Sequence, residues 1–547
     1  MKLGAIRGIS INSRSPSFRR MATGTTRAVS SPNAGQRTWN GLGPAESAAL
    51  DSGSEGAAHW PRIPSLPVRR DDGIYRIVPN LLAIVVGSAV LSACAIGPDY
   101  QRPAMDVPAV YKEQGDWKLA EPKDELLRGR WWQVFEDSPL NALAAQVDVS
   151  NQNLKVAEAR YRQAMTLPQS ARAGLWPSIA ANAAASRNKA AGSRTGGNSL
   201  IVNSNSLSAN ASWELDVWGR VRRQIESGNA SAEASAADLE AVRLSLQSEL
   251  ATRYFLLRVT DQQRQLFDDT VTAYERSLEL TKNRYNVGVA AKLDVIQAEA
   301  QLKSTLAQAI DLGVQRAQLE HSIAVLIGKA PGSFSLPREK FTLNMPVMPA
   351  GVPSTLLERR PDIAAAERRV MAANAQIGVA TAAWFPALTL SASGGFASPT
   401  FNEWFSAPFS FWSVGPQLAM TLLDFGKRSA ATDQAVASWE QSVATYRQTV
   451  LDGLQEVEDN LATLRILEQE AQVQDDAVRA ARESALLTIN QYKAGTVSYL
   501  NVVTVQASQL SNERTAVSLL GRRLAAAVGL IRALGGGWSA TELTAQK

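Results

Sequence analysis

The sequence offers few side chains that could carry out covalent chemistry. Of its 547 residues only two are histidines, His59 near the start and His321 in a helical stretch, and one is a cysteine. A Ser-His-Asp or Cys-His set needs a nucleophile beside a base, and these residues do not supply the parts. Gly328-Lys329-Ala330 lacks the upstream glycine and the following Ser or Thr of a phosphate-binding loop. We therefore expect no enzyme, no cofactor and no metal site.

The single cysteine, Cys94, stands where one covalent modification is expected. It ends the apolar run 81–94, which follows three arginines within residues 69–76. This order is typical of a secretory signal, and the run is shorter than the ~20 residues that a helix needs to span a bilayer. Leu91-Ser92-Ala93-Cys94 resembles a bacterial lipobox, so we expect Cys94 to be the mature N-terminus, carrying diacylglycerol and an N-acyl chain. Ala95 replaces the Asp typical of lipoproteins kept at the inner membrane, which implies export to the outer membrane.

The basic charge of the chain is concentrated at its start. The formal net charge is +5, but residues 1–76 hold 11 Lys or Arg against 5 Asp or Glu, leaving 45 basic and 46 acidic residues after them. A nucleic-acid-binding domain needs a basic face on its folded part, so we expect no nucleic-acid partner. Residues 1–76 are expected to be a leader. Either the gene is read from a start codon too far upstream, or the segment is a disordered extension. Residues 77–93 are then the hydrophobic part of the signal peptide.

The rest of the chain contains an internal duplication, with matching features about 207 residues apart. The matching segments are Leu175-Trp176-Pro177-Ser178 with Trp384-Phe385-Pro386-Ala387, Asp216-Val-Trp-Gly219-Arg220 with Asp424-Phe-Gly426-Lys427, and Tyr285-Asn-Val-Gly288 with Tyr492-Lys-Ala-Gly495. Each repeat is predicted to run helix, strand pair, long helix, turn, helix. We expect a lipidated N-terminal segment over 94–150, repeat 1 over 151–345, repeat 2 over 346–530 and a C-terminal tail over 531–547.

Two segments in each repeat are predicted to be strands. They are 179–187, 206–217, 387–397 and 412–422, and apolar and polar residues alternate most strictly in the second. Each has about the ten residues that a tilted transmembrane strand needs. The connecting loops are Gly/Ser/Asn-rich near 190–205 and aromatic near 394–410, which suits a membrane interface. Alternation by itself also fits a soluble sandwich, because the membrane signal of one strand is weak.

Long helices are predicted after each strand pair. No proline occurs from Gly219 to Ala330 or after Gln417, and apolar residues recur about every 3.6 residues in both stretches. An unbroken helix from residue 226 to 285 would be on the order of 90 Å long at 1.5 Å per residue. Ala-rich helices that reverse at Gly288 and Gly495 are expected to pack as antiparallel coiled coils.

Four strands cannot close a barrel alone, and an open edge in lipid leaves unpaired N–H and C=O groups at several kcal/mol each. Two copies would give a barrel of about eight strands, filled by its own side chains, whereas three leave room for a lumen. The predicted fold is therefore mainly α with a transmembrane β part. It is a duplicated repeat with a long antiparallel coiled-coil helical barrel, and a homotrimer in which four strands per chain contribute to a 12-stranded β-barrel. Apolar strand faces would meet outer-membrane lipid, and polar faces would line water.

Three motifs carry a resemblance to a known family. They are Gly97-Pro98-Asp99-Tyr100-Gln-Arg102-Pro103, Leu357-Glu358-Arg359-Arg360-Pro361-Asp362-Ile363 and Tyr492-Lys-Ala-Gly495-Thr-Val-Ser-Tyr499-Leu500-Asn501-Val502. From Cys94 to about Trp538 the chain resembles TolC-like outer-membrane factors, in the lipoprotein branch that works with proton-driven RND-type transporters. The resemblance implies a passive exit duct for drugs or other small molecules. It also implies two partners, a periplasmic adaptor (membrane fusion) protein and an inner-membrane RND-type transporter that supplies the energy. Pro361 and Asp362 suit the first turn of a helix, so we expect a structural role for that motif.

The resemblance further implies a periplasmic tip where the helical hairpins converge, close the resting duct and meet the adaptor. The corresponding residues are Tyr285, Gly288 and Asp294 in the first turn and Tyr492, Gly495, Asn501 and Thr504 in the second. Family members often carry acidic gate residues where this chain has Asn501 and Thr504, and Asp294 is the matching acid of the first repeat. A ring of three Asp294 carboxylates would attract cations. An equally weighted alternative for the tyrosines is plain helix-end packing, and both glycines suit helix-ending turns.

Two other functions stay open at this point. A duct of the same fold for protein secretion (type I) fits the same motifs, and a neighbouring gene for a peptide-exporting ATPase would favour it. A lipid-anchored periplasmic coiled-coil scaffold without a pore belongs to a different class, and it would give no conductance in a planar bilayer.

Overall fold

The computed structural model describes residues 95–113, 130–189, 201–339 and 359–538. All of them lie in Ile74–Lys547, one of the two compact units of the chain. Cys94, the predicted leader and the predicted signal segment lie outside the described residues. Among the helices that are described, none combines the length and the apolar character needed to cross a membrane.

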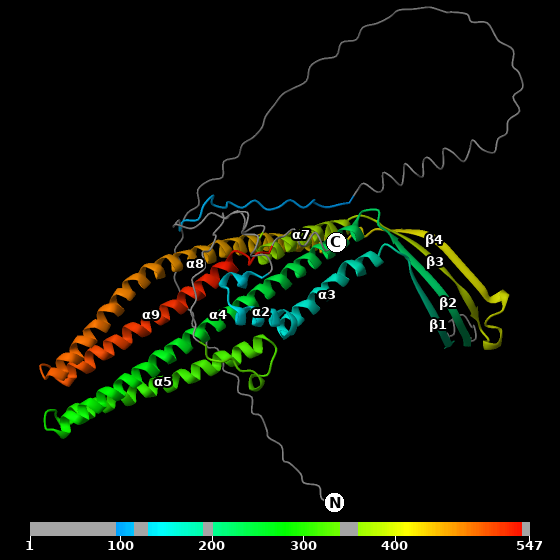
Figure 1. The fold of residues 1–547 in the computed structure, drawn as a ribbon. Coiled ribbons are helices and arrows are strands. Elements are labelled where there is room, and N and C mark those ends of the chain that lie inside the picture. Colours follow the sequence, from blue (N-terminus) through cyan, green and yellow to red (C-terminus); the bar gives the residue numbers. More distant parts are fainter. Residues whose placement is uncertain (1–94, 114–129, 190–200, 340–358, 539–547) are drawn as a thin grey trace, which may run out of the picture. The chain divides into compact units, whose positions relative to one another are not determined.

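Two copies of one structural repeat make up most of the described chain (Figure 1). The first contains α3 (Gln152–Ala173), β1 (Ser178–Lys189), β2 (Ile201–Leu215), α4 (Arg220–Asn286) and α5 (Lys292–Leu326). The second contains α7 (Pro361–Ala382), β3 (Ala387–Ser398), β4 (Ser410–Ala419), α8 (Lys427–Ala494) and α9 (Tyr499–Ala533). The predicted order of helix, strand pair and helical hairpin is thus confirmed. Helix α9 runs on to Ala533, past the residue at which the C-terminal tail was predicted to begin.

Proline residues mark the passage from helix to strand in both repeats. Helix α3 ends four residues before Pro177 and α7 ends four residues before Pro386, and a strand starts directly after each proline. A third proline, Pro361, is the first residue of α7, where its missing N–H costs no hydrogen bond. The neighbouring Arg360 is buried and pairs with Asp362 at 2.6 Å and with Glu456 at 2.8 Å. Although burial opposes the charged form, these hydrogen bonds raise the pKa of the Arg360 guanidinium above its ordinary value, which fits the predicted structural role.

The two long helices of the prediction are unbroken and longer than expected. Helix α4 has 67 residues and α8 has 68, which is about 100 Å each at 1.5 Å per residue. Both chain reversals contain a glycine with a left-handed φ of 79°, Gly288 and Gly495. Glycine adopts this conformation without a steric penalty, so the prediction of helix-ending turns at both positions is confirmed.

The main core lies where the chain before the first repeat packs on α4. The 3-10 helix η2 (Trp131–Phe135) and helix α2 (Ser138–Ser150) bury their apolar side chains against this helix. Trp131 and Phe255 are each 1% exposed, and the rings of Phe135 and Phe255 lie 4.8 Å apart. Helix α4 also contacts α3, α5, α7 and α9, so it joins the two repeats.

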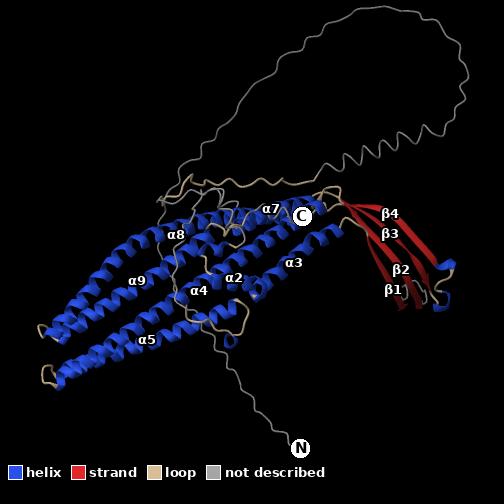
Figure 2. Cartoon of the chain, in the orientation of Figure 1, coloured by secondary structure: helices blue, strands red, loops and turns tan. Residues whose placement is uncertain are grey.

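The four strands form one antiparallel sheet in the order β1-β2-β3-β4 (Figure 2). Of the eight predicted strand limits only the start of β3 is correct; the others are wrong by one to five residues. Strand β2 begins at Ile201, inside the predicted loop, because it pairs there with the end of β1, and β3 continues to Ser398 opposite Asn205. Strand β4 ends at Ala419 and not at residue 422, because its neighbour β3 starts directly opposite, at Ala387.

Candidate functional site

The strand register gathers the apolar side chains on one face of the sheet. Directly paired residues of neighbouring antiparallel strands lie on the same face. One row across the sheet is Ile179, Ala211, Ala392 and Val414, and the adjacent row on the other face is Ala180, Asn210, Ser393 and Ser413. The apolar face also includes Ala181, Ala183, Leu207, Ala209, Trp213, Leu215, Leu388, Leu390, Phe396, Trp412 and Leu418. The sheet therefore has one continuous apolar face and one largely polar face.

The height of this apolar face suits a bilayer. On β2 it extends from Leu207 to Leu215, eight residue steps or about 27 Å along the strand, which is roughly 20 Å of height at the usual tilt of about 35–45°. Outer-membrane barrels carry an apolar band of ~25 Å. Beyond the band, Arg187 pairs with Asn203 on the same face, so the surface becomes polar.

Aromatic side chains gather in the connection between β3 and β4, as the sequence predicts. The 3-10 helices η5 (Phe401–Glu403) and η6 (Ala407–Phe409) lie in this connection. The ring of Trp404 lies 5.1 Å from that of Phe401 and 5.5 Å from that of Phe405. Phe401 and Phe405 are 71% and 66% exposed, which is the arrangement expected of side chains at a membrane interface.

The two strand-to-helix junctions are built alike. The Asp216 carboxylate accepts two backbone N–H groups of the first turn of α4 at 2.9 Å and pairs with the Arg222 side chain. The Asp424 carboxylate accepts the backbone N–H groups of Gly426 and Arg428 at 3.2 Å at the start of α8, and it pairs with the Arg428 side chain at 2.6 Å. The hydrogen bond from Arg428 holds the pKa of Asp424 below its ordinary value. Each carboxylate thus stabilises the positive end of a long helix.

The residues that directly follow Cys94 are held at the first junction. The Ile96 N–H donates to the Trp218 carbonyl at 3.1 Å. The guanidinium of Arg223, 6% exposed, donates to the carbonyls of Ile96 and Gly97 and pairs with Asp99 at 2.9 Å. These contacts tie residues 95–103, called the N-terminal segment below, to α4.

The same segment also contacts the second repeat. The Asn374 side chain donates to the Pro98 carbonyl at 2.9 Å. The Tyr100 hydroxyl donates to Glu367 at 3.2 Å, and Arg102 pairs with the other oxygen of that carboxylate at 3.0 Å. Because Asn374 and Glu367 belong to α7, the N-terminal segment lies across the boundary between α4 and α7. This role of the Gly97–Pro103 motif was not predicted.

Gly219 and Gly426 provide a matched test of that anchoring. Both precede a long helix with a left-handed φ, 79° and 91°, so alanine costs about 1–2 kcal/mol at either position. A Cβ at Gly219 would lie 2.8 Å from the Ala95 Cα, whereas a Cβ at Gly426 meets nothing within 4 Å. We expect faster hydrogen exchange of the Ile96 amide in Gly219→Ala and no change in Gly426→Ala. Equal exchange in the two variants would show that the N-terminal segment does not depend on this contact.

The first helix turn is exposed and contains the predicted acid. Tyr285 is 44% exposed, and Val287 and Val289 are 74% and 64% exposed. The Asp294 carboxylate accepts the Ala291 N–H at 3.3 Å in the first turn of α5, where a negative charge is favourable. Asp294 therefore has a local helix-capping contact, and its predicted gate role stays a prediction.

Tyr492, which precedes the second turn, is buried against the first repeat. Tyr492 is 4% exposed, and its hydroxyl donates to Thr281 at 3.5 Å. The guanidinium of Arg284 lies 4.8 Å from the Tyr492 ring centre and donates to the Lys493 carbonyl at 2.9 Å. Tyr499 stacks edge-on with Tyr492 at 5.3 Å, and burial raises the pKa of its hydroxyl. The structure thus joins the two turns through Arg284, which was not predicted, and gives Tyr492 but not Tyr285 a helix-end packing role.

The other predicted tip residues stay apart from these contacts. Asn501 and Thr504 are both exposed on the first turns of α9. The Thr504 hydroxyl donates to the Leu500 carbonyl of its own helix at 2.9 Å. Within the described parts of the chain, the recorded hydrogen bond of Asp294 also stays inside its own turn.

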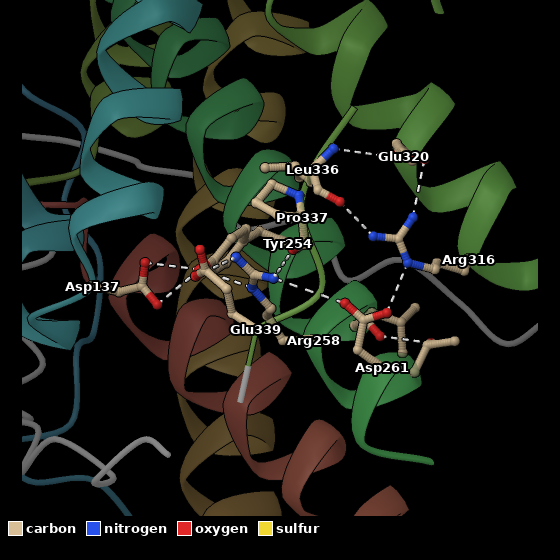
Figure 3. A network of polar contacts seen from close by, with 11 residues as sticks. Asp137, Tyr254, Arg258, Asp261, Arg316, Glu320, Leu336, Pro337 and Glu339 are labelled. Carbon is tan, nitrogen blue, oxygen red and sulfur yellow. Dashed lines mark hydrogen bonds and ion pairs between the residues drawn. The ribbon is translucent and has the colours of Figure 1, made fainter. Parts of the chain in front are cut away.

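A buried polar network on α4 was missed by the sequence analysis (Figure 3). The Arg258 side chain is 1% exposed and donates to the Pro337 carbonyl at 2.8 Å and to the Tyr254 hydroxyl at 3.2 Å. Tyr254 in turn donates to the Asp137 carboxylate at 2.8 Å, and burial raises the pKa of its hydroxyl. Asp137 caps α2 by accepting the Leu140 N–H at 2.8 Å. One arginine therefore links α4 to α2 and to the chain that follows α5.

The second half of this network fixes α5. Asp261, one turn after Arg258 and 3% exposed, pairs with Arg316 of α5 at 2.8 Å. Arg316 also donates to the Leu336 carbonyl at 2.6 Å and pairs with Glu320 at 3.1 Å. Arg258 and Asp261 continue the apolar stripe of α4 past Leu257 at helical spacing, and charges on a buried stripe are the signal that could have revealed the network.

Comparison with known proteins agrees with the two-repeat architecture. Residues 143–329 and 352–536 match the family described as outer membrane efflux protein. The probable efflux pump outer membrane protein TtgC of Pseudomonas putida is 30% identical over 463 residues, which cover 84% of this chain and 96% of TtgC. The cation efflux system protein CusC of Escherichia coli is 29% identical, covering 84% of this chain and 99% of CusC.

The structural comparison leads to the same group of proteins. The outer-membrane channel OprN is similar with a TM-score of 0.76 and 31% sequence identity, covering 81% of this chain and all of OprN. Both halves of the duplication match the family separately, and the strands and helical hairpins are those of a solved channel. The chain therefore belongs to the outer membrane efflux protein family and is an outer-membrane channel subunit of an efflux system.

Proposed function

We propose that three copies of the chain close a 12-stranded barrel in the outer membrane, and that their helices continue it as one exit duct through the periplasm. The observation that carries this proposal is the sheet. It has a continuous apolar face of bilayer height, and among the described residues its edge strands β1 and β4 each have one neighbour. Edges left open in lipid cost several kcal/mol per unpaired group. Closure by further copies removes that cost, and three copies leave a lumen.

The proposed partners are a periplasmic adaptor protein and an inner-membrane RND-type transporter, which supplies the energy because the duct itself is passive. Support comes from the exposed apolar side chains at the first turn, Val287, Val289 and Leu293, which are 74%, 64% and 62% exposed. Apolar side chains exposed together suit a protein contact. The cargo is proposed to be small molecules or ions, in line with the names of TtgC as an efflux pump protein and CusC as a cation efflux protein.

The proposed membrane anchor is the acylated Cys94. The next residue, Ala95, lies against Gly219, only four residues after the last apolar side chain of β2, Leu215. A lipid carried by residue 94 would therefore start near the periplasmic limit of the apolar band. That is the depth at which acyl chains can enter the inner leaflet of the outer membrane.

The test is reconstitution of the purified full chain in planar bilayers, with unheated SDS gels of the same sample. We expect a trimer that conducts and prefers cations, because three Asp294 carboxylates line the tip. Asp294→Ala should move the reversal potential in a salt gradient toward zero. Asp311→Ala, an exposed acid further along α5, should leave it unchanged. A monomer in the soluble periplasmic fraction, or a trimer that does not conduct even as the Asp294→Ala variant, would reject the proposal.

A further inference from the structure

The end of the sheet from which α4 and α8 start, called the inner rim below, carries different charges in the two repeats. We propose that Lys427, the first residue of α8, sets a preference for anions where the helical part of the duct opens into the barrel. The groups that it would favour are carboxylates and phosphates carried by the cargo. This inference rests on the proposed function, since it presupposes a trimeric duct whose lumen is lined by the polar face of the sheet.

The polar face itself is almost uncharged. Within the four described strands it consists mainly of Ser, Thr, Asn and Gln, with small residues between them. The one charged side chain of these strands on that face is Glu214, which lies in a row with Thr389 and Gln417 at the inner rim. A charge placed at the inner rim is therefore not masked by charges on the wall of the barrel.

The junction of the first repeat pairs each of its cations with an acid. Arg220, the first residue of α4, reaches back to Glu214 and donates two hydrogen bonds to its carboxylate, at 3.0 and 2.7 Å. Because Glu214 belongs to the polar face, this pair lies on the proposed lumen side. The next arginines of α4 are paired as well, Arg222 with Asp216 and Arg223 with Asp99.

The junction of the second repeat keeps the cation but lacks the acid. Lys427 lies 207 residues after Arg220, and both are the first residue of a long helix after a glycine with a left-handed φ. The same shift leads from Glu214 to Thr421, which carries no charge. The Lys427 side chain is exposed and forms no ion pair or hydrogen bond with any residue in the described part of the chain. Each chain therefore brings one uncompensated positive charge to the inner rim.

Thr421 lies on the same side of the sheet as the first pair. It continues the alternation of Gln417 and Ala419 on the polar face by two residues. It also lines one cavity together with Glu214 and Arg220. A hydroxyl group thus stands in the second repeat where the first repeat has a carboxylate facing the proposed lumen.

The position of Lys427 in its helix makes an unpaired charge unusual. A cation at the start of a helix is unfavourable, because the helix dipole makes that end positive. Arg220 and Arg428 offset this with carboxylates at 2.7 and 2.6 Å, whereas Lys427 does not. In a trimer three Lys427 ammonium groups form a ring, and rings of Lys or Arg in a pore favour anions. Cargo would then pass the Asp294 carboxylates at the tip and ammonium groups at the inner rim.

Exchanging the charges of the two junctions tests the inference in the full chain. Reversal potentials are measured in a potassium chloride gradient in the Asp294→Ala background, so that the tip carboxylate does not mask the inner rim. We expect Lys427→Gln and Thr421→Glu both to raise the ratio of potassium to chloride permeability, the first by removing the charge and the second by supplying the missing acid. Glu214→Gln should lower the ratio, because it frees Arg220. Each change should be roughly two- to four-fold at about 0.15 M salt, for three charges about one Debye length away, and larger in dilute salt.

Lys427→Arg and Thr421→Gln are the controls, since both keep the charge of the inner rim and should leave the ratio unchanged. The amount of trimer on unheated SDS gels should be the same in all these variants. Conducting trimers whose ratio responds to neither Lys427→Gln nor Thr421→Glu would overturn the role of Lys427 and leave the duct standing. A shift in Lys427→Arg as large as that in Lys427→Gln would overturn it too, because the charge would then not be the cause. Trimers that conduct in none of the variants would overturn the proposed function as well.

Discussion

Ala211→Arg is expected to deplete the assembled trimer from the outer-membrane fraction, whereas Asn210→Arg should leave assembly intact. Ala211 lies at the middle of the apolar face, opposite Ile179 and Ala392. An arginine on the lipid side of a barrel costs about 2–4 kcal/mol at the bilayer midplane, and a trimer carries three such residues. Asn210 is the preceding residue of the same strand and lies on the polar face, opposite Ser393.

The measurement is the amount of trimer on unheated SDS gels of the outer-membrane fraction, with the total amount of protein as reference. In the channels that Asn210→Arg forms, the added positive charge should move the ion preference toward anions, because this face lines water. Loss of assembly in Asn210→Arg together with normal assembly of Ala211→Arg would invert the assignment of the two faces.

The second large effect is expected inside the helical part of the protein. Arg258→Met should destabilise the detergent-solubilised protein by about 3–5 kcal/mol, the usual result of removing one partner from a buried charge pair. The variant would leave the Pro337 carbonyl and the Tyr254 hydroxyl without their donor and would leave Asp261 with one fewer nearby positive charge. Denaturant unfolding followed by circular dichroism measures the change.

Arg253→Met is the matched control on the same helix. Arg253 pairs with Glu249 at 3.4 Å, and both side chains are nearly half exposed. Exposed pairs of this kind contribute only about 0.3–0.5 kcal/mol. If the two variants lowered stability equally, the network around Arg258 would not be what fastens α2 and α5 to α4.

Local signals explain why so much of the fold could be predicted. A proline lacks the N–H that continues a helix, and Pro177 and Pro386 each stand directly before a strand, so they mark the helix-to-strand passages in both repeats. The residue that follows a helix often takes a left-handed φ, which glycine adopts most easily because it has no Cβ. Gly288 and Gly495 could therefore be identified as the turns that end the two long helices. The alternation of apolar and polar residues from Leu207 to Leu215 reflects the face of the sheet on which each side chain lies. It therefore also identified the apolar and the polar face of the sheet.

Features that depend on distant neighbours could not be predicted in this way. Strand β4 ends at Ala419 because of where β3 begins, although the alternation of its own sequence continues. Arg258 donates a hydrogen bond to the carbonyl of Pro337, which is 79 residues away in the sequence. The residues around Arg258 do not indicate that partner. Tyr285 and Tyr492 look equivalent in the sequence, yet Tyr492 lies against Arg284 and is 4% exposed, whereas Tyr285 is 44% exposed.

The N-terminal segment gives the assembly an asymmetry that the duplication alone would not produce. A ring of three duplicated chains contains six similar helix boundaries, three within chains and three between them. The segment occurs once in each chain and fastens α4 to α7 through Arg223, Asn374 and Glu367. Every second boundary of the ring is thereby reinforced, which reduces approximate six-fold symmetry to three-fold. Any dilation of the helical tube should then begin where one polypeptide meets another.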